Sequence, residues 1–263
     1  MRSERFDFPG SGNRLLAGRL DLPDSDPRAY ALFAHCFTCG KGSPAAVLIA
    51  AALAENGIAT LRFDFTGLGD SEGEFANAGF TSNVEDLVAA AAHLQATRLA
   101  PAILIGHSFG GSAVVAAARF IPEARAVATI GAPFEIDRVK RTFGGKLAEI
   151  EAKGEATVEV AGRSFRIGRG FVDDLKTQNQ ALRLRELNRA LLVFHAPTDS
   201  VVPIIEAMRL FEQAGQPKSF IALAEANHLL THRADARYTA DVLAAWAARY
   251  TGSKETLKTQ ETQ

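Results

Sequence analysis

The sequence predicts an α/β fold in which helices cover both faces of a mostly parallel sheet. Short apolar runs typical of buried strands alternate with helical patterns along most of the chain. The 263 residues suffice for one such domain with a modest insertion. At residues 101–119 a strand enters a Gly-x-Ser-x-Gly turn that opens a helix, and this context exposes one serine hydroxyl.

The expected elements follow in chain order and begin with a hairpin of strands at 5–8 and 15–22. Further strands are expected at 30–34, 59–65, 101–105, 126–130, 191–195 and 219–223, and helices at 45–56, 112–119, 203–214 and 234–250. One more helix is expected to open at a capping box, Ser82 to Glu85. Its apolar face predicts that His93 points toward solvent.

The alternation stops between residues 133 and 185, where the chain is rich in charged residues. A small hairpin with strands at 157–160 and 164–167 is expected there. We expect this segment to be a cap inserted over the site, within a single domain that spans residues 1–250. Residues 251–263 are polar and lack an apolar period, which is typical of a disordered tail.

Composition excludes several classes of protein. The formal net charge is −1 and no long basic run occurs, which argues against nucleic acid as a partner. The longest apolar run, residues 45–54, is too short to cross a bilayer, and the N-terminal residues lack the apolar core of a signal peptide. We therefore expect a soluble cytoplasmic protein with no membrane partner. Its oligomeric state stays open.

The chain has two cysteines, Cys36 and Cys39, which are far too few for a secreted disulfide framework. Two buried free thiols are the expected state, because the thioredoxin-type pattern of elements is missing around them. A redox switch that distorts this loop is the alternative hypothesis.

Ser108, in the turn Gly106-His-Ser-Phe-Gly110, is the candidate nucleophile. A serine hydroxyl attacks only when a base takes its proton, and the base needs an acid to orient it. In a parallel sheet these groups lie in loops after the carboxyl ends of strands. His228 follows the last expected strand, and Asp199 follows the strand before it. The sequence therefore predicts a catalytic triad of Ser108, Asp199 and His228.

The same chemistry requires two backbone N–H groups that bind the oxyanion. The first is expected from Phe109, which directly follows the serine. The second is expected from the loop after the strand that ends at His35, with Phe37 as the donor and Cys36 as the alternative. A glycine-rich turn follows residue 62 later in the chain, and Asp64 in this turn is expected to brace the loop rather than contact substrate.

These residues resemble the α/β-hydrolase superfamily over nearly the whole chain, to about residue 250. The matching segments are 34–37, 62–71, 106–111, Asp199 with Pro203, and His228. More narrowly, residues 33–39, 62–71 and 171–175 are similar to the hydrolase half of proteins fused to an OsmC-type, peroxide-handling domain. The sequence ends about where that second domain would begin, so peroxidase chemistry is not carried over.

The resemblance implies a serine hydrolase of the carboxylesterase type, which acts on small-molecule esters of small to medium acyl chains without a metal or organic cofactor. A thioesterase or a peptidase on the same scaffold, or a catalytically silent binding module, are the alternatives. Haloalkane dehalogenation is disfavoured because it requires an aspartate where Ser108 stands. The phenylalanines of the insertion either form an apolar lid or hold the insertion together; they are Phe134, Phe143, Phe165 and Phe171.

Overall fold

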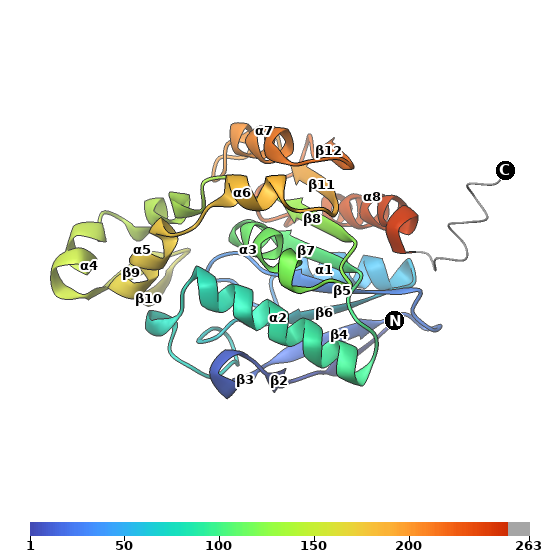
Figure 1. Ribbon diagram of the computed structural model, residues 1–263, viewed down its shortest axis with the longest axis horizontal. Helices are drawn as coiled ribbons and strands as arrows, with labels where there is room; N and C mark the ends of the chain where they lie inside the picture. The colour runs from blue at the N-terminus through green and yellow to red at the C-terminus, as the bar shows by residue number, and fades with distance from the viewer. Residues whose placement is uncertain (252–263) are drawn as a thin grey trace.

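The computed structural model describes residues 1–251 and shows a sheet between two layers of helices (Figure 1). Eight strands form the sheet in the order β1-β4-β6-β5-β7-β8-β11-β12. β4 runs antiparallel to both of its neighbours, and the strands from β6 to β12 are parallel. The mostly parallel sheet predicted from the sequence is therefore confirmed.

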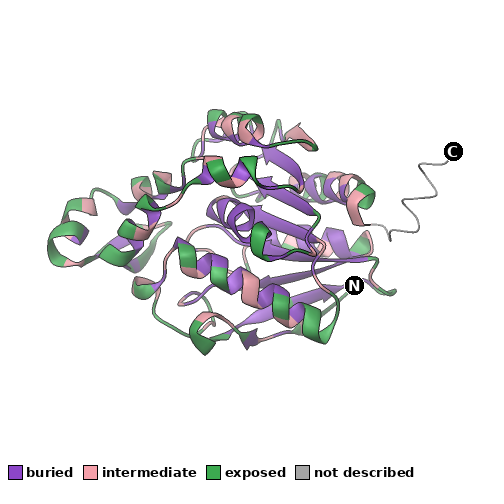
Figure 2. Ribbon diagram, viewed as in Figure 1, coloured by how far each residue is buried: buried purple, intermediate pink, exposed green. Residues whose placement is uncertain are grey.

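From residue 29 onward the strands of this sheet alternate with helices along the chain. They are β1 (Arg2–Arg5), β4 (Gly18–Leu22), β5 (Ala29–Ala34), β6 (Ile58–Phe63), β7 (Ile103–His107), β8 (Ala126–Ile130), β11 (Ala190–His195) and β12 (Lys218–Ala222). Every residue of β5, β6, β7, β8 and β11 is buried, as parallel strands covered on both faces require (Figure 2). The short strands β2 (Phe8–Pro9) and β3 (Leu15–Leu16) pair with each other outside this sheet.

Helices cover both faces of the sheet and divide the hydrophobic core into two clusters. The helices α1 (Pro44–Glu55) and α8 (Arg233–Thr251) bury apolar side chains in one cluster. The helices α2 (Phe80–Thr97), α3 (Phe109–Ala117) and α7 (Ile204–Gln213) do so in the other. None of the helices within residues 1–251 combines the length and the apolar character needed to cross a membrane.

The helix α2 differs from its prediction in two respects. It begins at Phe80 rather than at Ser82, and the Ser82 hydroxyl accepts a hydrogen bond from the Gly79 N–H at 2.8 Å inside the first turn. His93 does not point freely into solvent, because its ring lies 5.3 Å from that of Phe6. The N-terminal segment covers this flank of the helix, and the periodicity of α2 alone could not reveal that contact.

The segment between β8 and β11 forms the cap and extends to one side of the sheet (left in Figure 1). It contains a 3₁₀ segment (Ile136–Phe143), α4 (Leu147–Lys153), β9 (Glu155–Val160), β10 (Arg163–Gly168), α5 (Arg169–Lys176) and α6 (Gln180–Arg185). The predicted hairpin is confirmed as β9 and β10, whose turn residues Ala161 and Gly162 both have positive φ. The tail predicted at 251–263 lies outside the described residues, apart from Thr251 at the end of α8.

Three of the four cap phenylalanines hold the cap against the rest of the domain. Phe143, Phe165 and Phe171 are nearly fully buried. Phe143 and Phe171 pack on Phe37 with ring centroids 6.3 and 5.6 Å away, and Phe165 packs in the same core. Of the two roles considered, packing therefore fits these side chains better than an apolar lid. Phe134 instead lies under the Arg209 guanidinium.

Candidate active site

Ser108 lies in the tight turn that joins β7 to α3. Its φ of 54° and ψ of −122° are values that residues other than glycine rarely adopt. A Cβ on Gly106 would lie 2.3 Å from the Gly110 carbonyl oxygen, and a Cβ on Gly110 would lie 2.4 Å from that of His35. The glycines therefore let α3 approach β7 and β5 closely, and the partly exposed Ser108 is left at the edge of the sheet.

The structure brings the three predicted residues together. Ser108 Oγ lies 3.0 Å from His228 Nε2, and His228 Nδ1 lies 2.7 Å from Asp199 Oδ2. A carboxylate can only accept, so Nδ1–H of His228 donates to Asp199 and Nε2 is left to accept the Ser108 proton. His228 lies in the loop after β12 and Asp199 in the loop after β11, as expected from the sequence.

The Asp199 carboxylate is buried and accepts hydrogen bonds on both oxygens, with a side chain only 1% exposed. Its Oδ1 accepts the N–H groups of Val201 at 2.8 Å and Val202 at 2.9 Å. Burial raises the pKa of Asp199, but the hydrogen bonds from His228 and from these N–H groups outweigh burial and lower the pKa below its usual value. Asp199 is therefore ionised at neutral pH and holds His228 in the orientation that Ser108 requires.

Two histidines near the site have structural roles that the sequence analysis did not assign. His107 Nε2 donates to the backbone carbonyl of His228 at 2.7 Å, and His195 Nε2 donates to that of Val202 at 2.8 Å. Burial lowers the pKa of His107 to about 4, and it also lowers the pKa of His195. Both rings are therefore neutral at pH 7 and support the loops that carry His228 and Asp199. The feature of the sequence that could have indicated these roles is the position of each histidine at the end of a strand, His107 in β7 and His195 in β11.

Both predicted oxyanion donors are available. Phe37 lines the same cavity as Ser108, and Phe109 is the first residue of α3. Neither the Phe37 N–H nor the Phe109 N–H donates a hydrogen bond to any group within residues 1–251. Their rings are in contact, with centroids 5.5 Å apart. One of these two N–H groups thus belongs to the residue that follows Ser108, and the other to a residue that lines the same cavity.

The loop that carries Phe37 is a tight turn closed by a disulfide bond. The Cys39 N–H donates to the Cys36 carbonyl at 3.1 Å, and Thr38 has a left-handed φ of 59°. This turn brings the Cα atoms of the two cysteines to 5.3 Å, a separation that a disulfide can bridge. The expectation of two free thiols is therefore wrong, because Cys36 and Cys39 are bonded to each other.

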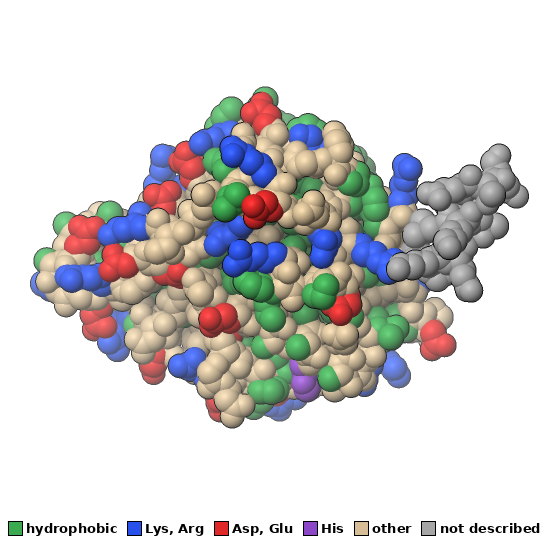
Figure 3. Space-filling model, viewed as in Figure 1, with side chains coloured by type: hydrophobic (Ala, Val, Ile, Leu, Met, Phe, Trp, Pro, Cys, Tyr) green, Lys and Arg blue, Asp and Glu red, His purple; other side chains and the backbone are tan. Residues whose placement is uncertain are grey.

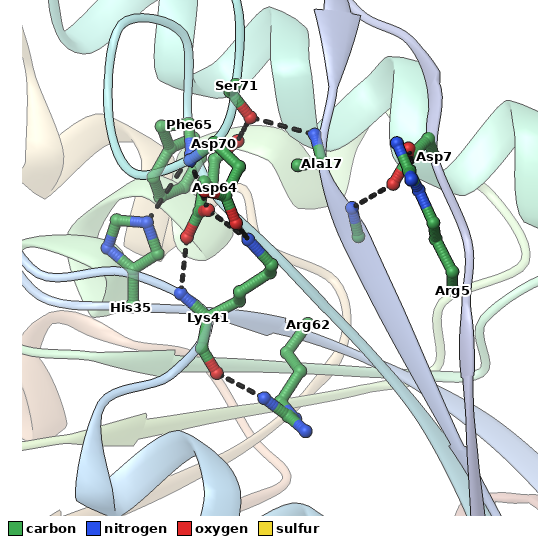
Figure 4. Close-up of polar contacts among 11 residues, drawn as sticks. Arg5, Asp7, Ala17, His35, Lys41, Arg62, Asp64, Phe65, Asp70 and Ser71 are labelled. Atoms are coloured by element: carbon green, nitrogen blue, oxygen red, sulfur yellow. Dashed lines mark hydrogen bonds and ion pairs between the residues drawn. The ribbon is translucent and has the colours of Figure 1, made fainter.

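Asp64 braces the same loop, as predicted (Figure 4). Its Oδ1 accepts the Lys41 N–H at 2.6 Å, and its Oδ2 accepts the Lys41 ammonium at 2.5 Å. The Asp64 side chain is 2% exposed. Arg62 donates to the Lys41 carbonyl and pairs with Asp21 at 2.5 Å. Two buried carboxylates therefore hold the segment after Phe37 through Lys41 and Arg62.

A cavity of about 860 Å³ opens at Ser108 and His228. The Phe37 loop, the turn that carries Asp64 and the β9–β10 hairpin of the cap line it. The cap contributes Thr142, Val160, Ala161 and Arg163 to this lining. Within the part of the chain that the structure describes, no cluster of three or more His, Cys, Asp or Glu side chains could hold a metal ion.

A serine at a strand–turn–helix elbow, in contact with a histidine that itself contacts an aspartate from another later loop, is typical of an α/β hydrolase. Residues 31–251 match the alpha/beta hydrolase family. The chain therefore belongs to this family, and the fold expected from the resemblance is confirmed.

Solved structures of other α/β hydrolases and esterases resemble this one. The esterase domain from a Rhodothermus marinus protein is 44% identical, with 96% of this chain and 100% of that chain covered and a TM-score of 0.78. Est1E from Butyrivibrio proteoclasticus, solved with ferulic acid bound, is 20% identical over 92% and 98% of the chains, with a TM-score of 0.81. Mouse alpha/beta hydrolase domain-containing protein 10 is 20% identical over 93% and 98%, with a TM-score of 0.75. The last two show a shared fold. No curated protein matches this sequence.

Proposed function

We propose that this protein is a carboxylesterase-type serine hydrolase that cleaves small to medium acyl esters through an acyl-enzyme. The observation that carries the proposal is the chain of contacts from Ser108 through His228 to Asp199 at the mouth of a cavity. The 44% identity to an esterase domain favours an ester as the bond that is cleaved. The narrower resemblance to the hydrolase half of OsmC fusion proteins stays a prediction.

In the proposed first step, Ser108 Oγ attacks the ester carbonyl while its proton passes to His228 Nε2. Asp199 stabilises the imidazolium that forms, because its ionised carboxylate accepts the Nδ1–H at 2.7 Å. The N–H groups of Phe37 and Phe109 bind the oxyanion of the tetrahedral intermediate. His228 then protonates the departing alcohol, and the acyl group stays on Ser108.

In the second step, water replaces the alcohol. His228 Nε2 takes a proton from the water, whose oxygen attacks the acyl carbonyl, and the oxyanion forms again at the Phe37 and Phe109 N–H groups. Collapse of this intermediate returns the proton to Ser108 Oγ and releases the carboxylic acid. Every proton transfer thus passes through His228 Nε2. This nitrogen carries no proton in the resting state, because the contact with Asp199 holds the ring proton on Nδ1.

The test is hydrolysis of p-nitrophenyl esters from acetate to a long acyl chain by the intact protein and by Ser108→Ala. We expect turnover that falls by roughly 10⁴-fold or more in kcat in the variant. Ser164→Ala, an exposed serine on the cap hairpin, is the matched control and should retain activity. Turnover that survives in Ser108→Ala would contradict the proposal. Acyl thioesters and peptide p-nitroanilides distinguish the thioesterase and peptidase alternatives.

A further inference from the structure

The cavity at Ser108 carries an excess of positive charge. Four cationic side chains and two carboxylates line it, which leaves a formal excess of two positive charges: Arg19, Lys41, Arg62 and Arg163 against Asp64 and Asp70. The excess is local, because the whole chain has a formal charge of −1. On the face shown in Figure 3, basic and acidic side chains are interspersed over the cap.

Ion pairs neutralise two of these four cations. Lys41 Nζ lies 2.5 Å from an Asp64 carboxylate oxygen and 2.6 Å from one of Asp70. Arg62 is paired with Asp21, as described above. Arg19 and Arg163, in contrast, form no ion pair with any carboxylate in residues 1–251. With Asp21 counted, these groups sum to a formal excess of one positive charge, and Arg19 and Arg163 are the two cations of the cavity that have no ion pair within residues 1–251.

Arg163 is held beside the oxyanion loop. It begins β10 in the cap, and its Nη1 donates to the Thr38 carbonyl at 3.3 Å, one residue beyond Phe37. Its guanidinium also lies 5.0 Å from the centroid of the Phe165 ring. These contacts use one of the five N–H donors of a guanidinium, and the others have no protein acceptor within residues 1–251. The cap thus presents an exposed guanidinium without a carboxylate partner within residues 1–251, on the wall of the cavity that contains Ser108 and His228.

Arg19 is the unpaired member of a row of arginines across three neighbouring strands. It lies opposite Arg62 on β6 and opposite Arg5 on β1. Like charges at opposite positions of antiparallel strands destabilise a sheet, and Arg5 and Arg62 are compensated by Asp7 and Asp21. Arg19 has no such partner within residues 1–251. It also lines a second cavity of about 290 Å³, which shares Lys41 and Asp70 with the first.

We propose that the preferred substrates are esters that carry an additional anionic group, such as a carboxylate, which Arg163 and Arg19 bind while Ser108 attacks the ester. This inference rests on the proposed esterase function and adds a substrate class to it. A guanidinium binds a carboxylate through two parallel charge-assisted hydrogen bonds. A cleft with an excess of one sign of charge also concentrates ligands of the opposite sign.

The test compares ester pairs that differ only in charge. For an anion on the acyl side, monomethyl esters of four- to eight-carbon dicarboxylic acids are paired with their ω-carboxamide isosteres. For an anion on the alcohol side, butyrate esters of ω-hydroxy acids are paired with those of the matching ω-hydroxyamides. We expect kcat/KM to favour the carboxylate by about tenfold or more in one of the two series. Added salt should reduce this ratio, because ions screen exposed charges.

Variants of the two arginines test which side chains cause the preference for a carboxylate ester. Arg163→Gln and Arg19→Gln should each reduce the carboxylate-to-carboxamide ratio, mainly through a higher KM for the carboxylate ester. Arg249→Gln, an exposed arginine in the last turn of α8, changes the net charge equally and should keep the ratio. Equal turnover of both members in both series would overturn the inference and leave the esterase function intact. A ratio that survives in both cleft variants would also overturn it. If no ester of any kind is hydrolysed, the proposed function and the inference fail together.

Discussion

His107 Nε2 donates a hydrogen bond to the backbone carbonyl of His228, with 2.7 Å between the two atoms. His107 ends β7, so the strand that leads into Ser108 also holds the loop of the proposed base. A carbonyl only accepts, so the His107 proton is on Nε2, and Nδ1 has no partner within residues 1–251. One buried, neutral imidazole therefore links the two groups that exchange a proton in the proposed mechanism.

This contact predicts an acid-dependent loss of stability. Burial lowers the pKa of His107 to about 4 in the folded protein, whereas a histidine in an unfolded chain titrates near ~6.5. Between these values the unfolded chain binds a proton at this position and the folded chain does not, so the free energy of unfolding falls as the pH falls. From pH 7.5 to 5 the contribution is roughly 2 kcal/mol.

Urea unfolding at pH 7.5 and 5 measures this loss. His107→Gln is neutral at every pH, so its free energy of unfolding should fall by roughly 2 kcal/mol less than that of the wild type. His232→Gln, an exposed histidine before α8, is the control and should behave as the wild type does. The same pH dependence in His107→Gln and the wild type would refute this role of His107.

Asp199→Asn tests how the proposed base is oriented. The variant Oδ1 can still accept the Val201 and Val202 N–H groups, which leaves the amide nitrogen facing His228 Nδ1. The ring proton of His228 must then move from Nδ1 to Nε2, because two donors would otherwise face each other. A protonated Nε2 can no longer accept the Ser108 proton. We expect kcat for p-nitrophenyl butyrate to fall by about 10⁴-fold with a folded protein by circular dichroism. A fall of less than tenfold would show that Asp199 does not orient the base.

Asp64→Asn tests the brace of the Phe37 loop. The substitution removes the buried charge that binds Lys41, and because the Lys41 ammonium keeps its contact with Asp70 we expect a loss of about 1.5–3 kcal/mol. Asp70→Asn is a matched control, because the Asp70 side chain binds the same ammonium but is 82% exposed, and exposed pairs contribute little. Chemical unfolding should give a clearly lower free energy of unfolding for Asp64→Asn than for Asp70→Asn. Equal stability of Asp64→Asn and the wild type would remove Asp64 from its bracing role.

Reduction of the disulfide should leave the position of the Phe37 N–H less restricted. Cys36 and Cys39 enclose Phe37 and Thr38, so the bond restricts the turn that presents one oxyanion donor. Loss of a positioned donor lowers kcat, by about 10²–10³-fold when the donor is lost completely. We expect a phosphine reductant to lower kcat several-fold while two thiols appear per chain. Cys39→Ser should have the lower kcat without reductant and show no further response. Identical kcat in both redox states would exclude a redox effect on the site.

The positions of the candidate site residues could be predicted because topology constrains them strongly. Ser108, Asp199 and His228 each follow a strand, and parallel strands gather their carboxyl ends at one edge of the sheet. Their order along the chain was therefore sufficient to predict that they meet. Their catalytic roles stay predictions. Asp64 was also predictable, since its glycine-rich turn follows β6 beside the strand that leads to Phe37.

Contacts between segments distant in sequence were beyond prediction. The cap hairpin was recognisable from its alternation, but its docking on Thr38 through Arg163 depends on how the whole cap packs. The unpaired state of Arg19 likewise emerges only when strand register places it between Arg5 and Arg62. His107 looked like a residue of the elbow alone, because nothing in its neighbourhood in sequence indicates the loop of His228.

Labelling with a fluorophosphonate tests the central claim most directly, because this probe forms a covalent adduct with an activated serine without requiring the natural substrate. Peptide mass spectrometry of the labelled protein should find one adduct, on Ser108. His228→Ala, which removes the proposed base, should label far more slowly, and Ser108→Ala should not label. Rapid labelling of another residue, undiminished labelling of Ser108→Ala, or no labelling of the folded wild-type protein would contradict the account of Ser108 as an activated nucleophile.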